Sequence, residues 1–278
     1  MIRILVDSAS DYMIEEAKKE NLEFVPLTVM LNDVTYKSGI ELEHDEFYEK
    51  LMAGKEFPKT AQPSPQDFLS IFEDAKEKGD DVICILLSSA LSGTFQSANL
   101  AKNIADYDRI FIIDSLTAAA GIRILAGYAS KLAAQGLSAE EIFTKVDALK
   151  TKVKIFAAVD TLEYLARGGR LNRTVAAIGE LANLKPIITL APEGNLEVPG
   201  KTLGRVKAIN YILNQLESRI IDTDFPMYSV YSYGTENVEK LEKKLEKEGY
   251  QIDKPCQIGA TIGAHVGPGA FGVIFVEK

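Results

Sequence analysis

Cysteine is scarce in this sequence, and its apolar runs are short. The 278 residues include two cysteines, Cys84 and Cys256, which lie far apart and form no Cys-x-x-Cys pair. This spacing supports neither a disulfide framework nor a zinc or thiol-redox site. No stretch approaches the roughly 20 apolar residues of a membrane-spanning helix, and an acidic residue, Asp7, follows the first apolar residues too soon for a signal-peptide core. We therefore expect a cytoplasmic protein with no metal site and no integral membrane segment.

Positive charge is also in short supply. The chain has 31 Lys and Arg against 40 Asp and Glu, a net charge of −9. Proteins that bind nucleic acids or anionic membranes need a basic surface, so both classes are disfavoured. Seven basic side chains against three acidic ones nevertheless fall within residues 167–207. This stretch favours contact with a phosphate group or an acidic partner.

Nucleotide chemistry has no support in the motifs. The phosphate-binding pattern G-x-x-x-x-G-K-[ST] does not occur. We therefore expect no ATP site of that kind and no resident cofactor. What the chain does have is 46% apolar residues, enough to build a sizeable core.

Segments typical of strands and helices alternate in the first half. This rhythm predicts a largely parallel sheet with helices on both faces. Strands are expected at Ile2–Val6, Glu23–Val29, Val82–Leu87 and Arg109–Ile113, and helices at about Tyr12–Glu20, Asp45–Ala53, Pro65–Gly79, Ser92–Ala105 and Ser115–Gln135, with another opened by a capping box at Ser138. Pro26 suggests an edge or bulge position within the second strand.

The second half predicts a smaller α+β domain with mixed or antiparallel strands. We place the division at residues 1–153 and 154–278. Strands are expected at Lys154–Val159, Ile187–Leu190, Leu196–Val198, Met227–Tyr231 and Gly272–Val276, and helices at about Gly204–Ser218 and Thr235–Lys247. A hairpin turn at Glu193-Gly194-Asn195 separates the second and third of these strands.

Three loops carry candidate binding groups. The loop Ser88–Thr94 follows a buried strand and opens a helix, so Ser92 and Thr94 could offer hydroxyl groups and free amides to an anion. Ser92 could equally be an ordinary helix cap. Thr60 precedes two prolines in a second, extended loop, where it could be a plain structural hydroxyl.

Histidine is nearly absent, which makes the third loop distinctive. The sequence around His265 contains several glycines and a proline, so we expect the ring to sit in a tight turn, where it could bind a carboxylate or merely satisfy a buried backbone group. His44 is expected to be a surface cap at a helix start. Arg170 and Arg205 belong to the basic stretch, and paired glycines before Arg170 give its loop a special shape.

An enzyme reading remains open at this point. Ser92, His265 and either Asp7 or Asp114 could form a Ser-His-Asp set. The sequence around Ser92 lacks the first glycine of the G-x-S-x-G motif. A serine hydrolase or acyl transferase is therefore one alternative, and a protein that binds another small anion such as a sugar phosphate is a second.

Taken together, these motifs resemble the DegV family, the fatty-acid-binding subunits of bacterial fatty acid kinases. The resemblance covers essentially the whole chain, and each motif is weak alone but specific in combination. The motifs are Asp7-Ser8-Ala9-Ser10-Asp11, Tyr36-Lys37-Ser38-Gly39, Thr60-Ala61-Gln62-Pro63-Ser64-Pro65, Ser88–Thr94, Asp114-Ser115, Thr161–Leu165, Arg167-Gly168-Gly169-Arg170, Lys185-Pro186 and His265–Gly269.

The resemblance implies a long-chain fatty acid held between two α/β domains, with its carboxylate presented to a separate ATP-dependent fatty acid kinase. By motif, Thr60, Ser92 and His265 would hold the carboxylate, with the amides of Gly93 and Thr94 nearby. Arg170 and Arg205 would face the kinase and the phosphate. The chain itself would then perform no catalysis.

Two positions depart from the family pattern. Ser38 stands where the family usually has Asp, and Ala61 replaces a common Ser. The apolar segment Leu116–Ala129 and the small residues 176–179 could leave room beside an alkyl chain, although ordinary helix packing explains them equally well.

Overall fold

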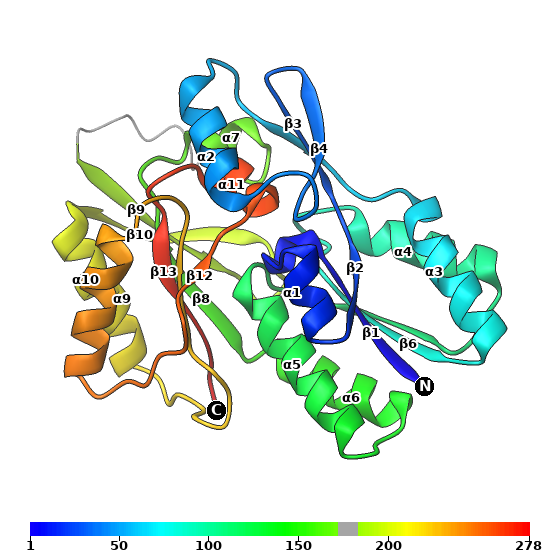
Figure 1. Ribbon diagram of the computed structural model, residues 1–278. Coiled ribbons are helices and arrows are strands. Elements are labelled where there is room, and N and C mark those ends of the chain that lie inside the picture. The colour runs from blue at the N-terminus through cyan, green and yellow to red at the C-terminus, as the bar shows by residue number, and fades with distance from the viewer. Residues whose placement is uncertain (172–182) are drawn as a thin grey trace.

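The computed structural model describes residues 1–171 and 183–278, and two sheets with their covering helices dominate the view (Figure 1). The small residues predicted at 176–179 lie outside the described residues. The predicted α/β class is confirmed: a parallel sheet is built from the first half and a mixed sheet from the second.

The first sheet has four parallel strands in the order β2-β1-β6-β7. Their bounds are β1 Ile2–Asp7, β2 Leu22–Val25, β6 Asp81–Leu86 and β7 Ile110–Asp114. Side chains alternate along β1, so Ile4 and Val6 join the core under α5 and α6, whereas Leu5 joins the core under α3 and α4. The helices are α1 Ile14–Lys19, α3 Pro65–Lys78, α4 Thr94–Ala105, α5 Ala120–Ala134 and α6 Ala139–Lys150. The predicted capping box at Ser138 is present, and Ser64 forms another with Asp67 at the start of α3.

The second sheet has six strands in the order β10-β9-β8-β13-β11-β12. Their bounds are β8 Val153–Ala158, β9 Leu184–Leu190, β10 Leu196–Leu203, β11 Tyr228–Tyr231, β12 Cys256–Gln257 and β13 Phe271–Val276. Neighbours run antiparallel except β11 and β12. Helices α9 (Arg205–Glu217) and α10 (Glu236–Lys247) cover one face, and the other face shares a core with α5 (Figure 1). Since β8 begins at Val153, the change of sheet lies at the predicted division, which itself stays a prediction.

A third, three-stranded sheet was not predicted. The expected strand Glu23–Val29 is wrong as one element, because the chain passes from β2 to β3 (Thr28–Leu31) at Pro26, which has no amide hydrogen to continue the ladder. Strand β3 pairs with β4 (Val34–Lys37) and β5 (Lys59–Ala61). Helix α2 (His44–Ala53) covers this sheet. Helix α11 (Ala260–Val266), from the end of the chain, packs against both, with the short α7 (Glu163–Arg167) beside it (Figure 1).

Several predicted helix boundaries need correction. The helix expected from Ser115 begins only at Ala120, because Leu116 and Ala119 adopt positive φ angles of 53° and 56°. The helix expected from Ser92 begins at Thr94. The tight turn expected around His265 is also wrong, since His265 lies in the last turn of α11.

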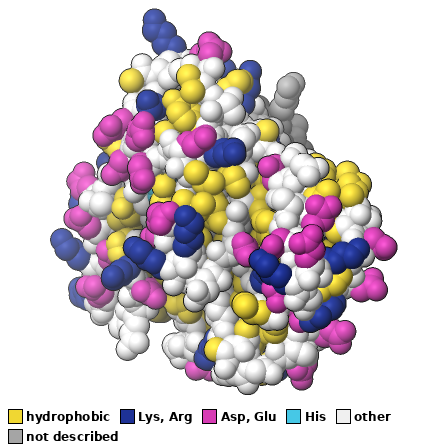
Figure 2. Space-filling model, turned by 45° about the vertical axis from the view of Figure 1, so that its right-hand side comes forward, with side chains coloured by type: hydrophobic (Ala, Val, Ile, Leu, Met, Phe, Trp, Pro, Cys, Tyr) yellow, Lys and Arg dark blue, Asp and Glu magenta, His cyan; other side chains and the backbone are white. Residues whose placement is uncertain are grey.

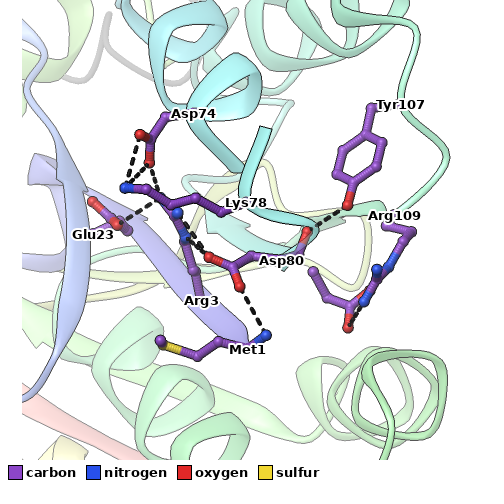
Figure 3. A network of polar contacts seen from close by, with 9 residues as sticks. Met1, Arg3, Glu23, Asp74, Lys78, Asp80, Tyr107 and Arg109 are labelled. Atoms are coloured by element: carbon purple, nitrogen blue, oxygen red, sulfur yellow. Dashed lines mark hydrogen bonds and ion pairs between the residues drawn. The ribbon is translucent and has the colours of Figure 1, made fainter. Parts of the chain in front are cut away.

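A polar network closes the amino-terminal end of the parallel sheet (Figure 3). Arg3 at the start of β1 pairs with Asp74 and Asp80, and Asp80 also accepts a hydrogen bond from the Met1 ammonium group. These hydrogen bonds, from the ammonium group first and from Arg3 second, lower the pKa of Asp80. The opposite, carboxyl-terminal ends of the strands are thereby left for ligand chemistry, as is usual for parallel sheets.

Candidate functional site

An apolar cavity lies between the parallel sheet and the face of the six-stranded sheet that is turned away from α9 and α10. Its volume is about 90 Å³. Most of the lining is aliphatic: Leu27, Leu87, Leu91, Ala118, Ala119, Ile155, Ala157, Leu165, Ile188, Leu190, Leu196, Val230, Ile258, Ile262, Val266, Ala270 and Ile274. Alternation along β8 explains part of this wall, because Ile155 and Ala157 face the cavity while Phe156 faces α9 and α10.

The loop before α5 contributes small side chains to this wall. Ala118 and Ala119 line the cavity within the predicted apolar segment, although they lie in a loop instead of a helix. An empty apolar cavity of this size costs a fold about 2 kcal/mol. The space therefore suits an apolar occupant.

Polar side chains join the lining at six positions: Thr60, Ser92, Arg170, Thr189, Thr261 and His265. Two of them are engaged with the protein itself. Thr189 donates to the carbonyl of Ile155, and Thr261 shares a hydrogen bond with Ser8. The other four residues, which we call the polar end, are the candidate binding groups, and they also make hydrogen bonds within the protein.

Thr60 and His265 meet directly at the polar end. Thr60 Oγ1 lies 2.8 Å from His265 Nε2, although 205 residues separate them. Thr60 comes from β5 and His265 from α11, so the packing of α11 on the three-stranded sheet creates this pair. Gly168 lets the chain pass close to the ring, because a Cβ there would lie 2.2 Å from His265 Nδ1.

The imidazole is held in its neutral form. Burial, with a further contribution from the positive charge of Arg170, lowers the pKa of His265 to about 4. A neutral ring carries its proton on one nitrogen only. If Nε2 donates to Thr60 Oγ1, the threonine hydroxyl proton is free to point toward an anionic ligand. The pair can therefore deliver a donor without a buried charge on the histidine.

Ser92 lies just before α4, where the sequence suggested an anion-binding loop. Its hydroxyl is 2.9 Å from Thr94 Oγ1 and accepts a hydrogen bond from the Thr94 amide at 3.3 Å. The cap residue of α4 is Gly93, so Ser92 is not the ordinary helix cap that the sequence allowed. Ser92 lies one residue earlier and lines the cavity. Thr94 is buried, and neither Thr94 nor Gly93 is among the residues that line the cavity.

Arg170 is the charged residue of the cavity lining. Its Nε donates to the carbonyl of Leu91 at 3.0 Å and its Nη1 to the carbonyl of Gly168 at 2.5 Å. The bond to Leu91 ties the segment after α7 to the loop that bears Ser92. Burial lowers the pKa of Arg170, but a guanidinium group keeps its charge in proteins. Arg170 therefore contributes positive potential at the polar end.

Arg205 lies elsewhere, on the surface. It is exposed at the start of α9, and its Nη2 is 3.7 Å from a carboxylate oxygen of Asp160. Lys185 contacts the same carboxylate group at 2.7 Å. The structure does not place Arg205 among the cavity residues. On the face shown in Figure 2, acidic and basic side chains are intermixed around a central group of apolar ones.

Three other residues singled out in the sequence, His44, Ser38 and Ala61, lie outside the cavity lining. His44 is not the cap of α2, because Glu43 occupies that position, and burial followed by the nearby Arg123 lowers the pKa of His44 to about 4. Ser38 is buried outside the cavity lining, and Ala61 is exposed, so neither departure removes a group from the cavity wall.

A Ser-His-Asp arrangement is not formed among the described residues. His265 bonds to Thr60 and Ser92 to Thr94. Asp7 accepts hydrogen bonds from backbone amides and Asp114 from Ser89.

The run Gly267–Gly272 matches the pattern G-x-G-x-x-G of dinucleotide-binding proteins. It leads from α11 into β13, whereas the dinucleotide motif leads from a strand into a helix.

The segment Asp7–Asp11 makes buried contacts that were not predicted from the sequence. Asp7 accepts hydrogen bonds from the amides of Ala9 and Leu87, both at 2.8 Å. Ser8 Oγ accepts from the amide of Leu27 and contacts Thr261, each at 2.9 Å. Asp11 Oδ1 accepts from the amide of Gly259 at 2.9 Å. The signal was the run of small polar residues at the carboxyl end of β1, but the distant partners could not be read from it.

The described residues hold no cluster of three His, Cys, Asp or Glu side chains suited to a metal ion. Over the same residues, no helix combines the length and the apolar character needed to span a membrane.

The chain is similar to known proteins over its whole length. The family model described as DegV, an uncharacterised protein family, matches residues 1–278. A DegV domain-containing protein of Caldanaerobacter subterraneus is 38% identical over 280 residues, covering 100% of this chain and 99% of the relative.

Solved structures agree over nearly the whole length. A DegV family protein from Thermus thermophilus, described for its fatty acid binding, has a TM-score of 0.89 at 32% identity and covers 100% of this chain and 99% of its own. DegV of Bacillus subtilis, described as a fatty acid binding protein, has a TM-score of 0.85 at 30% identity with the same coverage. A stearic-acid-binding protein from Eubacterium ventriosum has a TM-score of 0.87 at 28% identity, again covering 100% of this chain and 99% of its own.

Proposed function

The chain belongs to the DegV family, and from that premise we propose that it binds a long-chain fatty acid in the cavity and presents the carboxylate to a separate ATP-dependent fatty acid kinase. The observation that carries the proposal is the division of the cavity into a long aliphatic wall and one polar end. A fatty acid has the same division of chemistry.

The energetics favour this ligand class. Each buried CH₂ group contributes about 0.8 kcal/mol, so a long alkyl chain supplies most of the affinity. Burying the carboxylate costs several kcal/mol unless it is hydrogen-bonded. The hydroxyls of Thr60 and Ser92, the imidazole of His265 and the charge of Arg170 can offset that cost. The Gly93 amide would be a further donor near this end, whereas the Thr94 amide already donates to Ser92 Oγ.

The proposal also includes a separate kinase that acts on the bound carboxylate. The residues next to the polar end, including Ala61, Gln62 and Gly169, are exposed, which would let a partner approach the carboxylate. Arg205 lies on the surface, where it can contact a partner or a phosphate group. Arg170 would serve the carboxylate and the partner together. The partner would supply ATP and the chemistry, and a cytoplasmic location is part of the same proposal.

The proposal is tested by identifying any ligand that is bound to the purified protein. Native mass spectrometry is expected to show an added mass that solvent extraction identifies as a fatty acid, and the delipidated protein is expected to take up palmitate. A protein that stays empty after incubation with both palmitate and oleate would refute the proposal. A fluorophosphonate probe should leave Ser92 unlabelled, whereas labelling there would favour the hydrolase alternative.

A further inference from the structure

Helix α11 carries His265 to the polar end from the six-stranded sheet. The chain leaves that sheet after β12, passes through α11 beside α2 and the three-stranded sheet, and returns as β13 (Figure 1). The imidazole sits in the last turn of a helix of only seven residues. The position of the imidazole therefore depends on the contacts that fix the start of that helix.

Asp11 holds that start. Its Oδ1 accepts a hydrogen bond from the amide of Gly259, the residue that caps α11, at 2.9 Å. Amides at a helix start have no partner within the helix, and Asp11 supplies the partner of the Gly259 amide. Asp11 is fully buried, and its Oδ2 has no hydrogen-bond partner among the described residues. The carboxylate thus makes one bond, and that bond joins residues 248 apart.

Two neighbouring contacts fix the rest of the first turn. Tyr48 donates to the carbonyl of Ile258 at 2.8 Å, and Ser8 Oγ lies 2.9 Å from Thr261 Oγ1. Gly263 allows the helix to approach α2, because a Cβ there would lie 2.4 Å from the Tyr48 hydroxyl oxygen. Of the three side chains that contact the start of α11, only Asp11 bonds to the amide of the cap residue, Gly259.

Asp11 is itself held in place. Its backbone has a φ of 61° and ends the short 3₁₀ helix Ser8–Ser10. Arg123 donates to the carbonyl oxygens of Ser10 and Asp11, and its guanidinium carbon lies 3.9 Å from the centre of the Tyr12 ring. Burial, opposed by the Gly259 amide and by Arg123, raises the pKa of Asp11 to about 7. A carboxylate in this position is costly for the fold, which points to a role in geometry.

We propose that Asp11 is a positioning residue for the carboxylate site, which acts through the amide of Gly259 to keep His265 Nε2 beside Thr60. This inference rests on the proposed function. The role requires a hydrogen-bond acceptor at Oδ1, and a neutral amide oxygen can fulfil it.

The experiment compares the dissociation constants of palmitate and hexadecan-1-ol, which share a chain and differ in the head group. Asp11→Ala should reduce the preference for the acid about tenfold, the scale of one lost hydrogen bond to a charged group. Asp11→Asn should restore the preference, because its amide oxygen can accept the Gly259 hydrogen bond. His265→Ala should reduce it as well, and the double variant D11A/H265A should show no further loss.

Asp80→Ala is the matched control. Asp80 is also a buried aspartate tied to β1, but it lies at the opposite end of the strand in the network with Arg3 and Met1 (Figure 3). Its loss should destabilise the protein and leave the acid preference unchanged. If Asp11→Ala does not fold, Asp11→Ser, which leaves room for water at the Gly259 amide, is measured in its place and should show the same reduction.

The outcomes separate the two claims. A wild-type protein that does not prefer palmitate to the alcohol would remove the proposed function. A wild type with that preference, together with an Asp11→Ala or Asp11→Ser variant that keeps it, would overturn the role of Asp11 alone. A loss in Asp11→Asn as large as in Asp11→Ala would overturn it too.

Discussion

Replacing Thr60 with valine tests the polar end with the least change of shape. The substitution removes one hydroxyl and keeps the volume and branching of the side chain. In the structure that hydroxyl lies 2.8 Å from His265 Nε2, so the variant leaves the imidazole without its only hydrogen bond among the described residues. The aliphatic wall is unaffected.

The magnitude follows from the kind of bond removed. A hydrogen bond to a charged group contributes about 1.5–3 kcal/mol, which corresponds to a loss of about 10- to 100-fold in palmitate affinity. Hexadecan-1-ol binds through the same alkyl chain but has no charge to stabilise. Its affinity should change much less.

Displacement of a fluorescent fatty acid analogue measures both constants. Thr189→Val is the matched control, because Thr189 also lines the cavity but its hydroxyl donates to the carbonyl of Ile155 at 2.7 Å. That control should leave the ratio of the two affinities unchanged. If Thr60→Val keeps the wild-type ratio, or if Thr189→Val lowers it equally, the assignment of the polar end is refuted.

Three further predictions concern stability, the cavity wall and the partner. Burial raises the folded-state pKa of Asp11 from its ordinary 3.8 to about 7, so Asp11 binds a proton on folding between those pH values, and its contribution to stability falls as pH rises from about 4 to 7. Urea titrations should therefore show a smaller loss of unfolding free energy between pH 5 and pH 8 in Asp11→Asn than in wild type, and equal losses would contradict this. Ala157→Leu fills the cavity from β8 and should abolish palmitate uptake while the circular dichroism spectrum stays native; uptake at wild-type level would place the ligand elsewhere. Arg205→Ala should slow kinase-coupled acyl phosphate formation with no change in palmitate affinity, and unchanged turnover would remove Arg205 from the partner surface.

Local signals in the sequence predicted the elements well. The capping box at Ser138 is read from neighbouring residues, and it is present in the structure. The hairpin around Gly194 depends on turn chemistry and is also present as β9 and β10. The continuous apolar run Val82–Leu87 predicted a strand covered on both faces, as β6 is.

Long-range packing accounts for what could not be predicted. The glycines and the proline after His265 indicate a turn, but contacts of α11 with α2 and β3 hold the segment before them as a helix. Thr60 and His265 were expected in one site on the family resemblance, yet their direct hydrogen bond depends on the register of β5 with β3. The burial of Asp7 and Asp11 has no local signal, because each pairs with amides contributed by other elements.

The most direct test of the central claim is a crystal structure of the palmitate complex. We expect the alkyl chain along the aliphatic wall, including Ala157 and Ile188, with the carboxylate within hydrogen-bond distance of Thr60, Ser92 and His265. A carboxylate at the opposite end of the cavity, or a palmitate bound outside it, would refute the proposed site.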